Sequence, residues 1–228
     1  MKTAVVTGAS KGIGRAVAEA LAREGYDLAL GARSIDLLKG LAEELTAKYG
    51  VRVFYDYLDV SRNESVEEFA GKVLEEFGGV DLLVANAGIP MGGRLDELSN
   101  EDMERVLQVN TLGVWRTVKA FLPSLKERRG TVAVVTSYIS TMILPNAGAY
   151  VASKWASRAL TKTFQAENPE VKFIELRPGM VDTYFYGRPG RKIEEGFMKP
   201  EDVAELLIAL LKLPRHVLVE EVLFRSVY

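Results

Sequence analysis

The sequence predicts an α/β fold, a doubly wound parallel sheet of about seven strands with helices on both faces. Short apolar runs rich in β-branched residues alternate with longer amphipathic stretches from end to end. The runs are apolar at nearly every position, which is typical of parallel strands that are buried on both faces. A glycine-rich turn joins the first apolar run to the first amphipathic stretch. These three observations together predict this architecture.

The first half of the chain alternates four predicted strands with three predicted helices. The strands are the runs TAVVTG, YDLALGAR, VRVFYDY and GVDLLVANAG, at residues 3–8, 26–33, 51–57 and 79–88. The helices are the stretches between them, at residues 12–24, 34–49 and 62–77. Gly25, Gly50 and Gly78 stand where these helices should end, because glycine is favoured just after a helix.

The second half continues the alternation with three further predicted strands and three further predicted helices. The strands are GTVAVVTS, VKFIELRPG and HVLVEEVLF, at residues 130–137, 171–179 and 216–224. The helices are predicted at residues 100–127, 148–167 and 200–212. Ser99 and Pro200 are start signals for the first and last of them. A chain of 228 residues suits one undivided core, so we expect a single domain spanning residues 1–228.

Composition excludes several classes of function. With 29 basic and 31 acidic residues interspersed, the chain lacks the basic surface that nucleic acids require. The absence of cysteine excludes thiolate catalysis, and the single histidine, His216, excludes histidine clusters and a Ser-His-Asp triad. No metal site is expected, and His216, at the start of the last predicted strand, is expected to be structural. No stretch approaches a membrane span of roughly 20 apolar residues, so we expect a cytoplasmic protein with no membrane partner.

The glycine-rich turn TGASKGIG, at residues 7–14, is the first candidate binding site. Glycines at such a turn allow the backbone to approach a pyrophosphate, and the following helix N-terminus offers free N–H groups. An ordinary turn could carry the same glycines. Their position between the first strand and the first helix favours a Rossmann-type dinucleotide site.

The residues about 20 positions beyond these glycines distinguish the two nicotinamide dinucleotides. NAD enzymes place an acid there to bind the ribose diol, whereas this chain has Ala32 followed by Arg33. Lys11, inside the glycine loop, adds a second cation. Both cations would attract a 2′-phosphate, so NADP(H) is favoured over NAD(H), although either could instead be a solvated surface charge.

Tyr150 and Lys154 form the candidate catalytic pair. They lie one helical turn apart in AYVASKWASRAL, a spacing that is common and means little by itself. A phenol with a reference pKa of about 10 is a poor base at neutral pH, and a neighbouring cation lowers that pKa. The pair can therefore move a proton during hydride transfer between a nicotinamide and a carbonyl.

Seven motifs in their order along the chain resemble the short-chain dehydrogenase/reductase family, in its NADP(H)-preferring branch. They are TGASKGIG (7–14), LDV (58–60), NAG (86–88), Asn110 within VLQVNTLG, Ser137 thirteen residues before Tyr150, YVASK (150–154) and RPGMVDT (177–183). Two features depart from the family pattern. Ala85 replaces the first of two asparagines, and the segment between RPGMVDT and Pro200 is short. That segment, at about residues 180–199, is expected to form a short substrate lid.

The resemblance implies roles for four catalytic residues. Tyr150 would be the general acid in reduction and the general base in oxidation, and Lys154 would also bind the nicotinamide ribose. Ser137 would donate a hydrogen bond to the reacting oxygen, although a hydroxyl at a strand end could equally cap a loop. Asn110 would hold a water that links Lys154 to solvent. The poor helix propensity of Asn110 inside a predicted helix suggests that something other than propensity placed it there.

The resemblance also implies a cofactor-binding set that runs along the whole chain. Its members are Gly8, Ser10, Lys11, Gly12, Ile13, Gly14, Arg33, Asp59, Val60, Asn86, Ala87, Gly88, Tyr150, Lys154, Pro178, Gly179, Val181 and Thr183. Asp59 and Val60 would flank the adenine, and the last four residues would surround the nicotinamide, with Thr183 bonding its carboxamide. Asp59 could also be a turn residue, and Pro178 with Gly179 a simple turn.

The expected activity is an oxidoreductase that transfers a hydride between NADP(H) and a carbonyl or secondary alcohol. An apolar substrate is suggested by side chains near the predicted catalytic end, which could also be ordinary lid packing. These are Met91, Tyr138, Pro145, Asn146, Tyr184, Phe185 and Tyr186. The alternative is a catalytically idle dinucleotide-binding redox sensor or scaffold, which would have no use for the four catalytic residues. A nucleotide-sugar epimerase or dehydratase would need a larger C-terminal region than the one after Thr183.

The predicted helices at 100–127 and 148–167 carry more apolar residues than one buried face requires, including Trp115 and Trp155. In the family these two helices form an interface between subunits. A homo-dimer or homo-tetramer is therefore expected.

Overall fold

The computed structural model describes residues 1–228, the side chain of Tyr186 excepted, and its centre is a parallel sheet of seven strands. The strands are β1 (Thr3–Thr7), β2 (Asp27–Ala32), β3 (Val53–Tyr57), β4 (Leu82–Ala85), β5 (Thr131–Val135), β6 (Lys172–Pro178) and β7 (Glu221–Phe224). Their order is β3-β2-β1-β4-β5-β6-β7, and every neighbouring pair is parallel. The predicted doubly wound sheet is confirmed.

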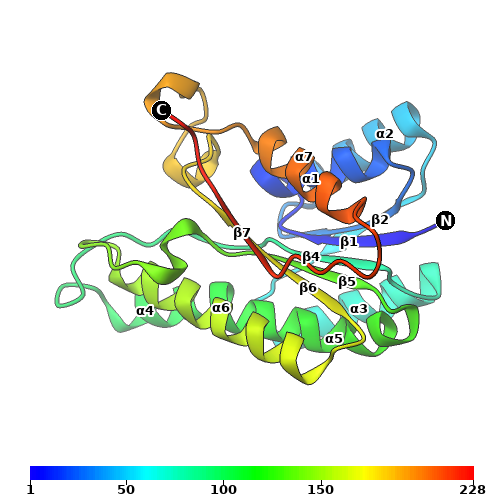
Figure 1. Ribbon diagram of the computed structural model, residues 1–228, viewed down its shortest axis with the longest axis horizontal. Coiled ribbons are helices and arrows are strands. Elements are labelled where there is room, and N and C mark those ends of the chain that lie inside the picture. The colour runs from blue at the N-terminus through cyan, green and yellow to red at the C-terminus, as the bar shows by residue number, and fades with distance from the viewer.

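Helices cover both faces of this sheet. They are α1 (Gly12–Arg23), α2 (Ile35–Tyr49), α3 (Asn63–Phe77), α4 (Asn100–Leu107), α5 (Gly113–Arg128), α6 (Gly148–Glu167) and α7 (Pro200–Leu211). Figure 1 shows α1, α2 and α7 above the sheet and α3, α4, α5 and α6 below it. Three 3-10 turns complete the fold: η2 (Tyr138–Thr141), η3 (Tyr184–Tyr186) and η4 (Ile193–Glu195).

The chain reverses its direction across the sheet between β1 and β4. It runs outward from β1 through β2 to β3 and then returns, so that β4 pairs with the free side of β1, with Val5 opposite Leu83. In open parallel sheets such a switch point leaves a crevice beyond the carboxyl ends of the two strands. The glycine loop follows β1 and the NAG motif follows β4, so both motifs open onto this crevice.

Two apolar cores lie against the two faces of the sheet. Successive residues of a strand point to opposite faces, and β1 follows this rule because Val6 belongs to the core under α1 and α7, whereas Val5 belongs to the core over α3 and α5. Leu21 is fully buried in the first core and Phe121 in the second. Each large apolar side chain buried in this way contributes roughly 1.5–3 kcal/mol to folding. The sheet is therefore held rigidly under the ends of its strands.

The prediction of one continuous helix at 100–127 is wrong. The structure breaks it into α4, a π turn at Gln108–Leu112, and α5. Asn110 lies in the π turn, where its carbonyl accepts a hydrogen bond from the Ser157 hydroxyl at 2.5 Å and its side chain bonds the backbone of Ile89. Gly113 packs so closely that a Cβ there would lie 2.7 Å from Cγ2 of Val60. These tertiary contacts outweigh the regular helical hydrogen bonds, and such π turns often occur at functional sites.

The last predicted strand, at 216–224, is also longer than the observed one. Only Glu221–Phe224 pair with β6, and His216 lies in an exposed turn before β7 instead of at the start of the strand. The Lys172 ammonium bonds the carbonyl of Val217 at 2.8 Å and that of Pro214 at 3.5 Å. Lys172 thus holds this turn against β6, and the backbone bonds to β6 include one from the N–H of Glu175 to the carbonyl of Glu220 at 2.9 Å.

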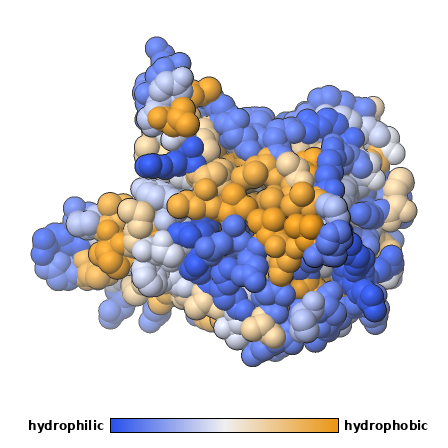
Figure 2. Space-filling model, in the orientation of Figure 1, coloured by the Kyte–Doolittle hydropathy of each residue, from blue (hydrophilic) through white to orange (hydrophobic). Residues whose placement is uncertain are grey.

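Apolar surface is visible on the face that carries the last strand. Figure 2 shows hydrophobic residues gathered over β7 and the neighbouring α7, in the middle of the view. Leu213, Leu218 and Leu223 are among the exposed large apolar side chains of this part of the chain.

Within the described part of the chain, no helix is both long and apolar enough to span a membrane.

Candidate active site

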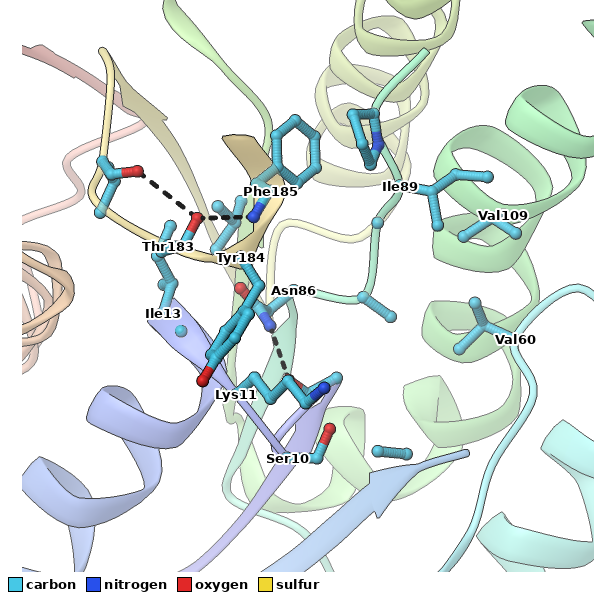
Figure 3. A pocket seen from close by; sticks show the side chains of 18 of the residues that line it. Ser10, Lys11, Ile13, Val60, Asn86, Ile89, Val109, Thr183, Tyr184 and Phe185 are labelled. Atoms are coloured by element: carbon cyan, nitrogen blue, oxygen red, sulfur yellow. Dashed lines mark hydrogen bonds between the residues drawn. The ribbon is translucent and has the colours of Figure 1, made fainter. Parts of the chain in front are cut away.

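A cavity of about 410 Å³ lies at the carboxyl ends of the central strands and collects most of the predicted site residues. Those that line it are Gly8, Ser10, Lys11, Gly12, Ile13, Arg33, Asp59, Val60, Asn86, Ala87, Gly88, Ser137, Tyr150, Lys154, Pro178, Gly179, Val181 and Thr183. Gly14 and Asn110 are not among the residues lining it. Residues separated by more than 170 positions in the sequence thus share one cavity, which Figure 3 shows from close by.

The glycine loop forms one wall of the cavity. Gly8 has a φ of 66°, a left-handed conformation that favours glycine, and a Cβ there would lie 2.9 Å from the Cα of Ala87. Asn86 ties the loop to β4, because its side-chain amide donates to the carbonyl of Thr7 at 2.9 Å. Gly14 lies behind the loop, where a Cβ would be only 2.3 Å from the carbonyl oxygen of Gly8. Gly14 therefore serves the close packing of α1 against the loop.

The N-terminus of α1 faces the same cavity. The helix begins at Gly12, and the Lys11 side chain before it makes no capping hydrogen bond to the first turn. The first N–H groups of a helix have no partner within the helix, and they carry a partial positive charge. A bare backbone loop and a helix N-terminus are what a pyrophosphate requires, so these residues fit a dinucleotide.

The outer end of the cavity carries exposed cations. Arg33 and Lys11 are both exposed, and the buried Ala32 stands beside Arg33 at the end of β2. The Lys11 ammonium lies 4.9 Å from the centroid of the Tyr184 ring, which reaches across the cavity toward it (Figure 3). Asp59 lines the cavity and also accepts hydrogen bonds from the hydroxyl and the backbone N–H of Ser61, at 2.6 and 3.0 Å. Its carboxylate thus holds the turn that leads into α3.

The inner end of the cavity holds Ser137, Tyr150 and Lys154. Lys154 is only 5% exposed, and its ammonium donates to the carbonyl of Val135 at 3.0 Å. That ammonium lies 5.7 Å from the centroid of the Tyr150 ring. Burial lowers the pKa of Lys154 to about 8, and the negative charge of Glu175 partly opposes this shift. The inner end therefore combines a phenol with a cation that titrates near neutral pH.

Ser137 is buried where β5 gives way to the turn η2. Its hydroxyl oxygen accepts a hydrogen bond from the backbone N–H of Ile139 at 3.3 Å, so it caps that turn, as the alternative interpretation anticipated. A hydroxyl that accepts in this way keeps its own proton available for a further acceptor. Capping the turn and facing the cavity are therefore compatible at this position.

Asn110 lies behind the inner end and is 1% exposed. Its amide nitrogen donates to the carbonyl of Ile89 and to the Ser153 hydroxyl, both at 3.0 Å, and its amide oxygen accepts from the N–H of Ile89. Gly88 allows this approach, because a Cβ there would lie 3.3 Å from the amide oxygen of Asn110 and 3.6 Å from the Lys154 nitrogen. Asn110 thus adjoins Lys154 without lining the cavity.

The segment after β6 closes the remaining side. The Thr183 hydroxyl accepts from the N–H of Phe185 at 3.2 Å and donates to the carbonyl of Val181 at 3.4 Å, which shapes the turn η3 (Figure 3). Tyr184 and Phe185 line the cavity, and the ring of Phe185 lies 5.4 Å from that of Tyr150. The other residues proposed for an apolar wall, Met91, Tyr138, Pro145 and Asn146, do not line it, and the side chain of Tyr186 lies outside the described residues.

Several lining residues were not among the predicted site residues. They are Ala32, Ser34, Leu58, Ile89, Pro90, Val109, Val135 and Thr136. Most of them stand next to a predicted residue along the chain, and Leu58 opens the LDV motif. Extending each motif by one or two positions at a strand end would have found them. Glu175, which acts on Lys154 from behind the cavity, has no comparable sequence signal.

Comparisons with known proteins agree with this arrangement. Residues 2–191 match the family model described as short chain dehydrogenase. The structure superposes with a TM-score of 0.98 on an alcohol dehydrogenase from the archaeon Thermococcus sibiricus complexed with 5-hydroxy-NADP, 59% identical over 100% of this chain and 97% of that one. It superposes with a TM-score of 0.85 on a short chain dehydrogenase/reductase from Burkholderia phymatum in complex with NAD, 31% identical over 92% of this chain and 85% of that one.

A further relative is much longer than this chain. The glycine betaine reductase ATRR of Emericella nidulans is 36% identical over 234 residues, which cover 97% of this chain and only 18% of the relative. The match therefore concerns one part of that protein. The family match over most of the chain, the shared fold and the motifs around one cavity lead to the same conclusion. This chain belongs to the short-chain dehydrogenase/reductase family and is an oxidoreductase that uses a nicotinamide dinucleotide.

Proposed function

We propose that this oxidoreductase transfers a hydride between NADP(H) and the carbonyl or secondary alcohol of a small to medium apolar substrate, as a carbonyl reductase or alcohol dehydrogenase. The observation that carries the proposal is one cavity with two chemically different ends. Exposed cations lie at the outer end, and a half-buried phenol lies with a buried ammonium and a buried hydroxyl at the inner end. The placement of these two groups at opposite ends of one cavity suits an extended dinucleotide, whose 2′-phosphate and nicotinamide ring lie far apart.

The preference for NADP(H) rests on Arg33 and Lys11. Both cations are exposed at the cavity, and Ala32 leaves no carboxylate at the end of β2 to repel a 2′-phosphate. The 59% identical alcohol dehydrogenase was solved with 5-hydroxy-NADP, which supports the same choice. The 31% identical relative was solved with NAD, so membership in the family does not decide the matter, and the charges carry the argument.

The proton chemistry is assigned to Tyr150, Lys154 and Ser137. A nicotinamide held beside these residues would supply the hydride to the substrate carbon in reduction and take it up in oxidation. In reduction the Tyr150 phenol donates a proton to the carbonyl oxygen, and in oxidation the phenolate accepts it back. The Lys154 ammonium stabilises the phenolate and holds the ribose hydroxyls, and the Ser137 hydroxyl donates its free proton to the reacting oxygen.

Asn110 is assigned a supporting part in the proton path. Its side chain bonds Ile89 and Ser153, which holds the π turn next to Lys154. We assign it to a water that links the Lys154 ammonium to solvent, so that the proton lost from Tyr150 is replaced. A catalytically idle sensor or scaffold would gain nothing from this buried arrangement.

Thr183 and its neighbours are assigned to the nicotinamide and the lid. Pro178, Gly179, Val181 and Thr183 surround the ring in this proposal, with Thr183 bonding the carboxamide. The lid spans about residues 180–199, and Asp182 anchors it by accepting from the Lys199 ammonium and the N–H of Gly190, both at 3.0 Å. The aromatic rings of Tyr184 and Phe185 at the cavity favour an apolar substrate.

The proposed form of the enzyme is a homo-dimer or homo-tetramer of one cytoplasmic domain, residues 1–228. Its support is the exposure of large aromatic side chains on two neighbouring helices, Trp115 on α5 and Trp155 on α6, which are 36% and 44% exposed. Exposed aromatic residues of this size are typical of interfaces.

A screen of aldehydes, ketones and secondary alcohols, followed by the absorbance of NADPH, tests the proposed function. We expect turnover of apolar carbonyl compounds with NADPH and weaker turnover with NADH. Tight binding of NADPH, measured by fluorescence, without turnover of any compound would favour the sensor or scaffold instead.

A further inference from the structure

Glu175 is a fully buried carboxylate that the proposed reaction does not use. It lies in β6, and its side chain is 0% exposed. One carboxylate oxygen accepts hydrogen bonds from the hydroxyls of Thr136 at 2.7 Å and Ser140 at 3.2 Å. The other pairs with the guanidinium of Arg158 at 2.6 Å. Burying a charge is strongly unfavourable unless it is paired and bonded, so this arrangement calls for a reason.

The partners of Glu175 adjoin the proposed catalytic residues. Thr136 directly precedes Ser137 at the end of β5, and Ser140 lies in the turn that Ser137 caps. Arg158 lies one helical turn after Lys154 on α6. The carboxylate therefore joins the strand end that carries the hydroxyl to the helix that carries the ammonium.

Glu175 also acts on Lys154 through its charge. Lys154 is buried, and burial disfavours its ammonium form because the charge loses water. The negative charge of Glu175 opposes that effect and raises the pKa of Lys154 toward its ordinary value. Without this carboxylate, less of the lysine would be charged at neutral pH.

Other titratable groups lie on the elements that carry or adjoin the pair. They are Tyr150, Arg158 and Lys162 on α6, Arg177 on β6, Glu221 on β7, and Tyr138 and Tyr184 on the 3-10 turns. The segments 86–90 and 108–112, which reach Lys154 from the other side, carry no titratable side chain. Arg158 also pairs with Glu221 at 2.6 Å, and Lys162 and Arg177 pair with Glu221 at 3.3 and 3.8 Å. Arg158 thus keeps a carboxylate partner when Glu175 is neutralised.

We propose that Glu175 is a positioning residue for hydride transfer: it keeps Lys154 in its ammonium form and fixes the strand end that carries Ser137. Arg158 holds the Glu175 carboxylate in place and partly neutralises its charge, which limits the electrostatic effect of that carboxylate on Lys154. The inference rests on the proposed function, because it takes Lys154 as the cation beside Tyr150. Its test therefore includes a measurement that needs neither substrate nor turnover.

Glu175→Gln tests the charge with little change of shape, since the amide oxygen still accepts from Thr136 and Ser140. If activity requires charged Lys154, the rate of NADPH-dependent reduction should fall at alkaline pH. In this variant that alkaline limb should move to lower pH by about one unit, the size expected for a lost opposite charge nearby. The midpoint of the Lys154 side-chain NMR signal, assigned with Lys154→Met, should move in the same direction.

Arg158→Met tests the opposite sign. Removing this cation leaves the charge of Glu175 less compensated and removes a repelling charge near Lys154. Both the alkaline limb and the NMR midpoint should therefore move to higher pH. A purely structural role for the ion pair predicts lower rates in both variants without opposite movements of the midpoint.

Asp27→Asn is the matched control. Asp27 is also 0% exposed and pairs with an arginine, Arg52, at 2.7 Å, but it lies at the amino end of β2, away from the cavity. We expect Asp27→Asn to lower Tm about as much as Glu175→Gln does. The alkaline limb of its pH–rate profile and the midpoint of its Lys154 NMR titration should not move. An unmoved NMR midpoint in Glu175→Gln would overturn the inference, whatever the activity. A moved midpoint in a protein without turnover would retain the electrostatic role and reject the proposed function.

Discussion

The two ends of the cavity hold their cations in opposite ways. At the outer end Lys11 and Arg33 are exposed, and the Lys11 ammonium also lies 4.9 Å from the centroid of the Tyr184 ring. At the inner end Lys154 is 5% exposed, bonded to the carbonyl of Val135 and influenced by Glu175. Exposed cations need no supporting structure, whereas a buried one needs partners to remain charged.

The difference separates recognition from chemistry. Exposed charges can select a phosphate at long range, and dissolved salt screens them over about 8–10 Å. A buried ammonium is screened far less, and its pKa responds to each neighbouring charge. The outer end should therefore determine which dinucleotide binds, and the inner end should determine the rate and its dependence on pH.

The largest expected effect is that of Tyr150→Phe. The variant keeps the ring but loses the only proton that the phenol can donate, so kcat should fall by about 10³-fold, within the range for general acid–base catalysis. The Kd for NADPH, measured by fluorescence titration, should be unchanged. Retained turnover would show that another group supplies the proton. It would also contradict the assignment of the proton chemistry to the inner end of the cavity.

Lys154→Met should reveal the free energy of burying the ammonium. Folding lowers the pKa of Lys154 from 10.5 to about 8, so folding releases protons between these pH values. By proton linkage the wild type gains stability as pH rises through this window, and it loses that stability as pH falls toward 8. The gain over the methionine variant should be on the order of 3 kcal/mol, from 1.36 kcal/mol per pKa unit.

Urea unfolding at several pH values between 7 and 10.5 measures this gain. The difference between the two proteins cancels the titration of other groups, provided that these groups behave alike in both. A difference that stays constant across the window would mean that Lys154 is not charged and buried in the way described.

The smallest effect concerns Arg33→Asp at the outer end. Reversing this charge should shift the ratio of kcat/KM for NADPH and NADH toward NADH by about 10- to 100-fold, the value of one or two charge-assisted hydrogen bonds. The shift should shrink as salt is added, because the site is exposed. Lys126→Asp reverses an exposed charge on α5 that does not line the cavity, and it should leave the ratio unchanged. An unaltered ratio in Arg33→Asp would contradict the 2′-phosphate assignment.

Much of the fold could be predicted because its signals are local. The apolar run TAVVT became β1, and GAYVASKWASRALTKTFQAE became α6 with the predicted bounds 148–167. Ser99 caps α4 by accepting from the N–H of Asp102 at 3.1 Å, as its position predicted. Periodicity and capping depend on residues a few positions apart, so a single sequence contains this information.

The failures occurred where distant residues compete with local preference. The helical periodicity of residues 100–127 continues through Asn110, but the bonds from Asn110 to Ile89 and Ser157 produce a π turn. Gly14 stays a predicted cofactor-binding residue, but its motif did not indicate that it packs behind Gly8 instead of lining the cavity. In both cases the deciding contact lies outside the helix that carries the residue.

The sequence by itself determined the alternation of strands and helices, the glycine loop after β1, and the presence of a tyrosine and a lysine one helical turn apart. Only the tertiary structure decided that the glycine loop and this pair share one cavity, and that Lys154 is buried deeply enough to shift its pKa. It alone brought Glu175 to Thr136, 39 positions away, and to Arg158 on another element. The physical reason is that burial and electrostatic fields depend on every group packed around a site, whereas a motif describes only the neighbours along the chain.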